Sequence, residues 1–432
     1  MKLSNIDRQI LAIAIPAIVT NITTPLLGLM DVAITGHLGR AEYIAAIAVG
    51  GNIFNMLYWI FSFLRSGSSG LTSQAYGAGD CRGYSCVLYR SLIVATFIGL
   101  CILLFSKPIV DVFVAWMGIG GDTVVFTRRY FNILVWGAPA FLCTYSVSGW
   151  LIGMQDSRGA MWMSLLINVI NICASMALVL LAGMKIEGVA LGTLIAQWGG
   201  VLIGCGLVAR RHRLESVSMS DLLERIELGR FFRVSRDLFF RTVCLVAVTL
   251  WFTRVGAAQG TLMLAANTLL MQFFLFFSYF TDGFAYAGEA LGGRYVGERD
   301  AEKFRQTVVR LMMWGGAVAV VFVSVYAFAG ELILRLLSNE ETVVAKACEF
   351  LPWIVVMPLA GFAAFVYDGV YIGATGTGYL LGSMILSSIV FFGCYMLLFG
   401  VFGNDGLWVA FLLYLATRGV YLGWRRGKLV KN

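Results

Sequence analysis

Twelve long apolar runs follow one another along this chain, and they restrict its fold more than any other feature. About 20 apolar residues suffice for a helix to cross the hydrocarbon core of a bilayer. The runs are longer than barrel strands and do not alternate polar with apolar residues, which argues against a membrane β-barrel. With 59% hydrophobic and 13% charged residues, a soluble domain of this length could not bury its apolar surface. We therefore predict an all-α membrane protein with twelve transmembrane helices.

Three of the predicted spans, beginning near residues 43, 261 and 345, exceed thirty residues, so they should tilt, kink or project beyond the bilayer. The first run is too long for a cleaved signal and is followed by more membrane. The predicted spans are residues 10–35, 43–76, 86–106, 124–153, 160–183, 188–209, 236–257, 261–293, 306–329, 345–374, 379–401 and 405–424.

Lysine and arginine are distributed unequally between the two sides of these spans. The side that holds both termini has 22 of them and the other side has 8, while Arg65 and Arg418 lie within spans. Cytoplasmic loops of membrane proteins carry the excess of positive charge, so both termini are expected in the cytoplasm. The expected location is the inner (cytoplasmic) membrane. The net charge of +8 then lies beside anionic lipid, and no nucleic-acid partner is expected.

The two halves of the chain match at a constant shift of 220 residues. Gly77–Asp80 precedes Gly297–Asp300 by this shift, and Gly149 precedes Gly369 by it. A shared spacing of several weak matches indicates an internal repeat.

The repeat divides the chain into an N-terminal bundle at 1–209, a basic connection at 210–235 and a C-terminal bundle at 236–432. Each half has six spans, so both halves enter the membrane from the same side. We therefore predict two pseudo-twofold-related six-helix bundles around a central cleft, an architecture typical of alternating access.

Asp31 stands late in the first span with no cation within a helical turn. Helical spacing puts it on one stripe with Asn21 and Thr35. Carboxylates in hydrocarbon almost always face an interior and mark proton or ion pathways, so Asp31 is the candidate coupling residue. The alternative is a structural hydrogen bond to a neighbouring helix.

A polar line along the second span includes Asn52, Asn55 and Trp59, followed by serines at spacings of three or four. Close helix packing explains the serines alone. Two asparagines and an indole on the same line favour the wall of a wet cavity. Further polar residues of the fifth and sixth spans continue this lining: Asn168, Asn171, Ser175, Thr193 and Gln197.

The second half carries its acids at other positions. Asp282, Tyr286 and Glu289 share one face of the eighth span, and Asp368 and Tyr371 share a face of the tenth. We expect these residues at the substrate cavity. For Glu289, an ion pair with a basic loop residue such as Arg294 remains an equal alternative.

Several functional classes lack their motifs. The chain has no phosphate-binding loop for ATP, no nucleophile with a histidine and an acid, and no metal-ligand spacing. Its nine scattered cysteines read as small buried hydrophobes. We therefore expect no enzyme, no cofactor and no metal site, and transport driven by a proton or sodium gradient.

Four motifs resemble the multidrug and toxic compound extrusion (MATE) transporters, and specifically their DinF-like branch. They are Pro25–Asp31, Gly149–Gln155, Asp282–Ala290 and Asp368–Thr375. The resemblance implies that Asp31 is the proton or cation site of the N-terminal bundle, with polar partners at Asn171 and Thr193. The family usually has an acid at the position of Ser175, so here Asp31 is the one evident titrating group of that bundle, which weighs against tight sodium binding.

Together these features predict a cation-coupled, most simply proton-coupled, antiporter that exports amphipathic and often cationic organic compounds. Trp59, Tyr286 and Tyr371 would supply aromatic surface, and the acids of the second half would supply negative charge. The expected partners are small-molecule substrates and the lipid bilayer, with the chain as a monomer. Alternatives are a sodium-coupled exporter and a flippase of lipid-linked precursors, for which Arg65 is the one supporting residue. No reactive group or continuous polar pore suggests a membrane-embedded enzyme or a channel.

Overall fold

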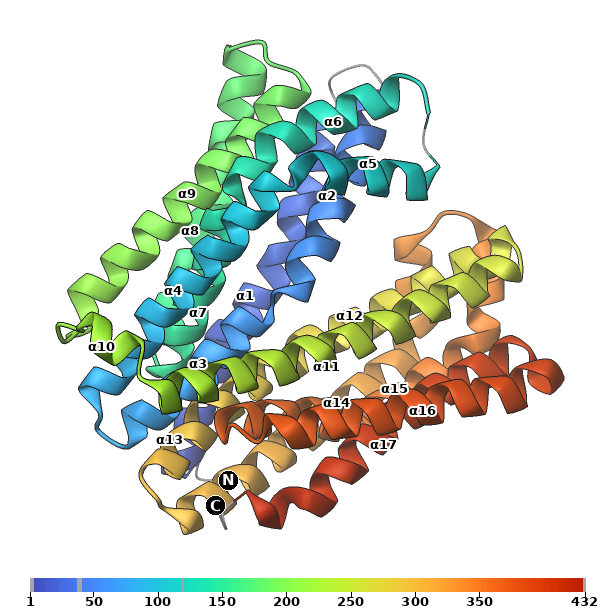
Figure 1. The fold of residues 1–432 in the computed structure, drawn as a ribbon. Helices are drawn as coiled ribbons and strands as arrows, with labels where there is room; N and C mark the ends of the chain where they lie inside the picture. Colours follow the sequence, from blue (N-terminus) through green and yellow to red (C-terminus); the bar gives the residue numbers. More distant parts are fainter. Residues whose placement is uncertain (1–3, 37–40, 119, 430–432) are drawn as a thin grey trace. The chain divides into compact units, whose positions relative to one another are not determined.

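The structure, a computed structural model, describes residues 4–36, 41–118 and 120–429. These residues form helices joined by short turns and contain no strand, and twelve helical segments are long and apolar enough to cross a membrane (Figure 1). The prediction of an all-α protein with twelve spans is confirmed. The backbone of Asp31 is helical, but its side chain lies outside the described part of the structure.

The chain forms two compact units, and the first span, Asn5–Thr23, is divided between them at Ile18. The N-terminal unit comprises Val19–Phe231. Its elements are the later part of α1 (Asn5–Gly36), α2 (Ala41–Ile60), α3 (Phe63–Gly77), α4 (Cys81–Leu104), α5 (Ser106–Met117), α6 (Asp122–Leu134), η1 (Val135–Gly137), α7 (Ala138–Gly153), α8 (Ser157–Met176), η2 (Ala177–Leu181), α9 (Ile186–Arg211) and α10 (Met219–Leu222).

The C-terminal unit comprises the chain up to Ile18 together with Phe232–Asn432. The N-terminal end of α1 thus packs with the second half of the sequence, whereas the sequence placed all of residues 1–209 in one bundle. The other elements of this unit are α11 (Arg225–Ala258), α12 (Thr261–Ala287), η3 (Gly288–Gly292), α13 (Gly293–Gly297), α14 (Ala301–Leu337), α15 (Glu341–Gly373), α16 (Thr377–Phe402), α17 (Asn404–Arg425) and η4 (Arg426–Lys428).

Polar contacts hold the first turns of α1 within the C-terminal unit. The Asp7 carboxylate accepts hydrogen bonds from the backbone N–H of Ser4 at 2.9 Å and from the Trp314 indole at 3.2 Å. The Tyr295 hydroxyl donates to Gln9 at 2.9 Å. α1 is therefore anchored at its start by α13 and α14.

Two of the predicted spans are interrupted. A turn at residues 61–62 separates α2 from α3, and the short η1 separates α6 from α7. α15, in contrast, stays helical over 33 residues with Pro352 and Pro358 inside it. The amphipathic α5 between α4 and α6 lies, apart from its first residue, in a stretch that belongs to none of the predicted spans.

The turns of the two units repeat at the shift of 220 residues found in the sequence. Gly79 and Arg299 both have positive φ, at 71° and 58°. The following aspartates cap the next helix in the same way: Asp80 accepts from the Gly83 N–H at 2.7 Å, and Asp300 accepts from the Lys303 N–H at 2.9 Å. The repeat is thus present in the backbone and its caps.

Helix contacts repeat at the same shift. A Cβ on Gly149 would lie 2.0 Å from the carbonyl oxygen of Arg65, and a Cβ on Gly369 would lie 2.0 Å from that of Ala285. Both glycines therefore allow a helix backbone to approach where any side chain would collide. The internal packing of the two units follows one plan.

Candidate functional site

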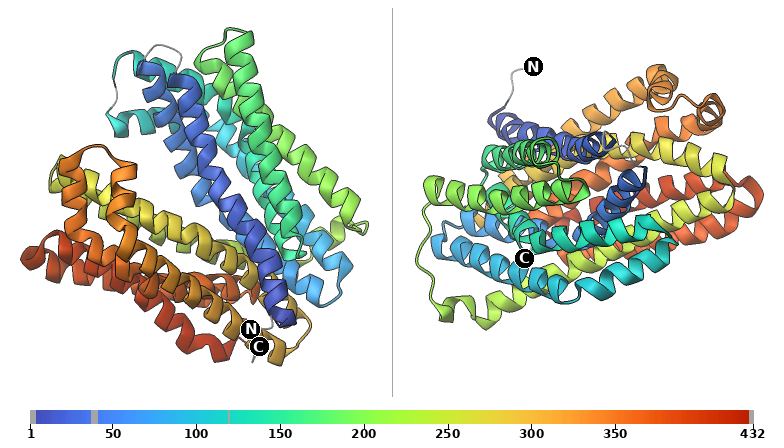
Figure 2. Two further views of the ribbon diagram at one scale, coloured as in Figure 1. Left: turned by 180° about the vertical axis from the view of Figure 1, so that it is seen from behind. Right: turned by 90° about the horizontal axis from the view of Figure 1, so that it is seen from above.

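Two buried polar side chains join α8 to α9, which lie side by side in the N-terminal unit (Figure 2). The Asn171 amide donates to the Thr193 hydroxyl at 2.8 Å, and that hydroxyl donates to the Val189 carbonyl oxygen at 3.1 Å. Asn171 is fully buried and Thr193 is nearly so. Two residues expected to act together, from spans that follow one another in sequence, therefore touch.

An acceptor atom of this pair lacks a hydrogen-bond partner within the described part of the chain. Among the described residues, the Asn171 Oδ1 atom has no hydrogen-bond partner, and neither does the Ser175 hydroxyl one turn further along α8. Buried polar atoms in native proteins are rarely left unpaired, so a donor is expected at this place. Asp31 belongs to the same unit by its position in α1.

The polar line of the second span lies on an exposed face of α2. Asn52, Asn55 and Trp59 are all exposed, the indole by 40%. The opposite face of the helix is packed, with Phe54 stacked on Phe131 at 4.8 Å. The three predicted cavity residues thus present two amides and an aromatic surface together.

The acids of the eighth span lie in different surroundings. Asp282 and Tyr286 on α12 are half-buried, whereas Glu289 is only 1% exposed and lies in the π-helical η3. Such π-segments occur frequently at functional sites. Arg294, the alternative partner named for Glu289, donates to Glu298 at 2.6 Å.

Asp368 is bound by two arginines from other helices of the C-terminal unit. Its Oδ2 atom accepts from Arg418 of α17 at 2.5 Å and also from Arg241 of α11. The Arg418 guanidinium is buried against the rings of Tyr414 and Phe365 at 5.5 and 5.9 Å. The negative charge expected from Asp368 is therefore matched within the unit.

Tyr371, one turn beyond Asp368, is fully buried. Its hydroxyl donates to the Leu422 carbonyl oxygen at 2.6 Å, and its ring contacts the rings of Tyr367 and Tyr379. In this structure the ring ties α15 to α17 and presents no open aromatic face.

The sequence offered a partial signal for the two arginines. Arg418 was visible inside the last span, and an intramembrane cation calls for an acid partner. Arg241 lies near the start of the predicted span 236–257, where the sequence assigns it to the basic residues of the cytoplasmic side and indicates no role in a site. Its partner lies 127 residues away, which no local pattern indicates.

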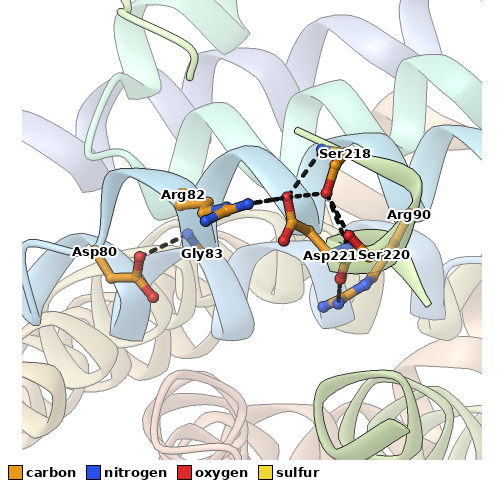
Figure 3. A network of polar contacts seen from close by, with 7 residues as sticks. All are labelled: Asp80, Arg82, Gly83, Arg90, Ser218, Ser220 and Asp221. Carbon is orange, nitrogen blue, oxygen red and sulfur yellow. Dashed lines mark hydrogen bonds and ion pairs between the residues drawn. The ribbon is translucent and has the colours of Figure 1, made fainter. Parts of the chain in front are cut away.

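The connection between α9 and α11 is attached to the N-terminal unit by a polar network (Figure 3). The Asp221 carboxylate accepts from Arg82 of α4 at 2.5 Å and from the Ser218 hydroxyl at 2.7 Å. These hydrogen bonds, first Ser218 and then Arg82, hold the pKa of Asp221 at about 2. Arg90 donates to the backbone oxygens of Asp221 and Leu222. The basic connection therefore has a defined docked conformation.

Comparison with known proteins assigns the family. The MatE family model matches residues 16–176 and 237–398, which is one copy in each half of the chain. The chain belongs to the MatE family. The prediction of a MATE-type transporter is thereby confirmed, and the doubled match agrees with the internal repeat.

MatE relatives extend over nearly the whole chain. DNA damage-inducible protein F of Escherichia coli K12 is 35% identical over 431 residues, covering 98% of this chain and 93% of the relative. A probable multidrug resistance protein NorM of Synechocystis is 23% identical, covering 98% and 95%. A crystal structure of a MATE protein in the bent conformation superposes with a TM-score of 0.88 at 19% identity, covering 99% and 97%.

These findings establish the broad class. The MatE family consists of membrane transporters that act on small molecules, so this chain is a multi-pass membrane transporter and not an enzyme. The 35% identity to the Escherichia coli protein also confirms the expected DinF-like branch.

Proposed function

We propose that this MatE protein is a proton-coupled antiporter that exports amphipathic, often cationic, organic compounds by alternating access. The observation that carries the proposal is the buried Asn171–Thr193 pair, whose Asn171 Oδ1 atom lacks a donor among the described residues. A protonated Asp31 carboxyl is a donor of the kind this oxygen lacks. When Asp31 binds its proton, the Asn171 oxygen would gain a hydrogen-bond donor, and when Asp31 releases the proton, the oxygen would lose that donor.

The residues around this pair favour a proton over sodium. Asn171, Thr193 and Ser175 are neutral, and Ser175 stands where the resembling family usually has a second acid. A hard cation prefers several charged oxygen ligands, whereas one carboxyl is sufficient for a proton. Sodium coupling is the alternative that the transport experiment below tests.

The driving force is adequate for export. One proton moving inward across about 100 mV contributes about 2.3 kcal/mol. Since about 1.4 kcal/mol corresponds to a factor of ten, this sustains a substrate gradient of roughly fortyfold.

Substrate recognition in the proposal uses the exposed polar and aromatic face of α2 together with acids that are more buried. The face formed by Asn52, Asn55 and Trp59 offers stacking and amide contacts, and Asp282 and Glu289 offer negative charge. The Synechocystis relative, a probable multidrug resistance protein, supports organic substrates of varied structure.

The contacts of Arg241 and Arg418 do not favour a flippase of lipid-linked precursors. Such a protein would need unmatched positive charge for a pyrophosphate, and Arg241 and Arg418 are instead paired with Asp368. We further propose a monomer in the inner membrane with both termini in the cytoplasm, in keeping with the asymmetry of basic residues.

The test is transport by purified protein in liposomes, with a proton gradient and a sodium gradient imposed separately. Wild-type protein should transport on the proton gradient alone, and Asp31→Asn should abolish transport while remaining folded and inserted. Asn171→Ala should slow transport, because it removes the hydrogen-bonding amide. Sodium-driven transport by the wild type, or near-normal transport by Asp31→Asn, would contradict the proposal.

A further inference from the structure

Three charged side chains from three helices meet in the C-terminal unit. Arg241 of α11 and Arg418 of α17 both donate to the Asp368 carboxylate of α15. Two positive groups and one negative group give this cluster, which we call the charge cluster, a formal sum of +1. A carboxylate with two arginine partners needs no further cation to be neutralised.

The side chains of the two arginines differ in burial. The Arg418 side chain is 3% exposed and rests against two aromatic rings, so its removal would leave a hole in the packed interior. The Arg241 side chain is 17% exposed, so it is less enclosed than that of Arg418. Arg241 is therefore the more replaceable cation of the charge cluster.

We infer that Arg241 determines the charge selectivity of the C-terminal unit by excluding exchangeable cations from Asp368. Its guanidinium is covalently tethered to α11 and stays in the place where a metal ion, a proton or a cationic substrate would otherwise neutralise that carboxylate. A tethered cation cannot be released during a transport cycle. The inference rests on the proposed function only in what it means for substrate choice, because ion binding can be measured without transport.

The inference has a consequence for coupling. Asp368 has permanent counter-ions in Arg241 and Arg418, which come from helices far away in the sequence. Because these tethered cations cannot leave, Asp368 takes up no proton or metal ion during the transport cycle. The C-terminal unit therefore contributes no exchangeable cation through this residue.

The experiment measures equilibrium binding of tetraphenylphosphonium, an amphipathic monovalent cation, to detergent-purified protein. All variants carry Asp31→Asn, so that the coupling site does not contribute. Arg241→Gln lowers the formal charge of the charge cluster by one unit and should tighten binding about tenfold, as expected for one unit charge acting over about 10 Å at an effective dielectric constant of about 20. Arg241→Lys keeps the charge and should bind like the parent.

Two further variants keep the inference falsifiable. Adding Asp368→Asn to Arg241→Gln restores the formal charge of the parent and should return the affinity to that of the parent. Asp368→Asn alone raises the formal charge by one unit and should favour tetraphenylborate, the anion of the same shape, over tetraphenylphosphonium. It provides a route that does not require Arg241→Gln to fold.

The inference is overturned if folded Arg241→Gln shows no gain in cation affinity, or if the gain survives Asp368→Asn. Folding is checked by size-exclusion chromatography and thermal unfolding. Failure of the proposed function has a different signature, which is wild-type protein in liposomes that does not transport on a proton gradient.

Discussion

Asp156 provides a quantitative test of the electrostatics at one end of the N-terminal unit. It caps α8 by accepting from the Gly159 N–H at 2.8 Å, and it pairs with Arg211 at 3.2 Å and His212 at 3.4 Å at the end of α9. Burial opposes the charged form, but the hydrogen bonds from His212 and Gly159 and the pair with Arg211 outweigh it and lower the pKa of Asp156 to about 2. The charged carboxylate therefore stabilises the junction of the two helices.

The magnitude follows from this pKa. The side chain is 16% exposed, and a fall from 3.8 to about 2 corresponds to about 2 kcal/mol of stability at neutral pH. Asp156→Ala should lose about that amount, because it removes both the charge and the cap. Asp156→Asn should lose about 1 kcal/mol, because asparagine is also a good N-cap.

Amide hydrogen exchange at the first turn of α8 is the direct assay. Loss of about 2 kcal/mol should make these amides exchange roughly thirtyfold faster in Asp156→Ala when opening is local. The sign of the pH effect is also fixed: the contribution is complete above pH 3.8 and is lost as pH falls through about 2. The difference in thermal stability between wild type and Asp156→Ala should therefore shrink over that interval. Equal exchange rates, or a difference that persists at pH 2, would refute the reasoning.

Two further predictions concern packing and docking. Asp221→Ala should free the connection between α9 and α11 and increase its cleavage by trypsin several-fold in limited proteolysis, and Arg82→Ala should have a smaller effect because Ser218 still holds the carboxylate. Gly369→Ala should cost about 2 kcal/mol in thermal unfolding, because its Cβ would collide with the helix backbone on the neighbouring α12. Gly400→Ala, where no atom lies within 4 Å, is the matched control and should be neutral or slightly stabilising.

The span pattern and the repeat could be predicted because lipid leaves few choices. A span must be long and apolar, and a duplicated bundle keeps turn residues such as Asp80 and Asp300, which cap the next helix in the same way. The break between α2 and α3 could not be predicted in the same way. The residues around it stay mostly apolar, and the interruption depends on neighbouring helices that satisfy the backbone.

The residues of the candidate sites also differ in how far the sequence could predict their contacts. Polarity in an apolar setting assigns Asn171 and Thr193 to one polar lining, and the resemblance to MATE transporters implies that they act together, as their hydrogen bond agrees. The partners of Asp368 could not, since helices far apart in sequence bring them together. Whether an intramembrane acid is available or already matched depends on these distant contacts.

The anchoring of α1 has a consequence for taking the protein apart. A cut between α9 and α11 would leave the first turns of α1 on one fragment and their hydrogen-bonding partners, Trp314 and Tyr295, on the other. The two halves of the chain are therefore not independent folding units, because the C-terminal unit includes the first turns of α1, which the first half of the sequence encodes. Co-expressed fragments should reassociate through this exchanged helix, whereas a C-terminal fragment that is expressed alone should require residues 5–18 to be grafted onto it or supplied as a peptide.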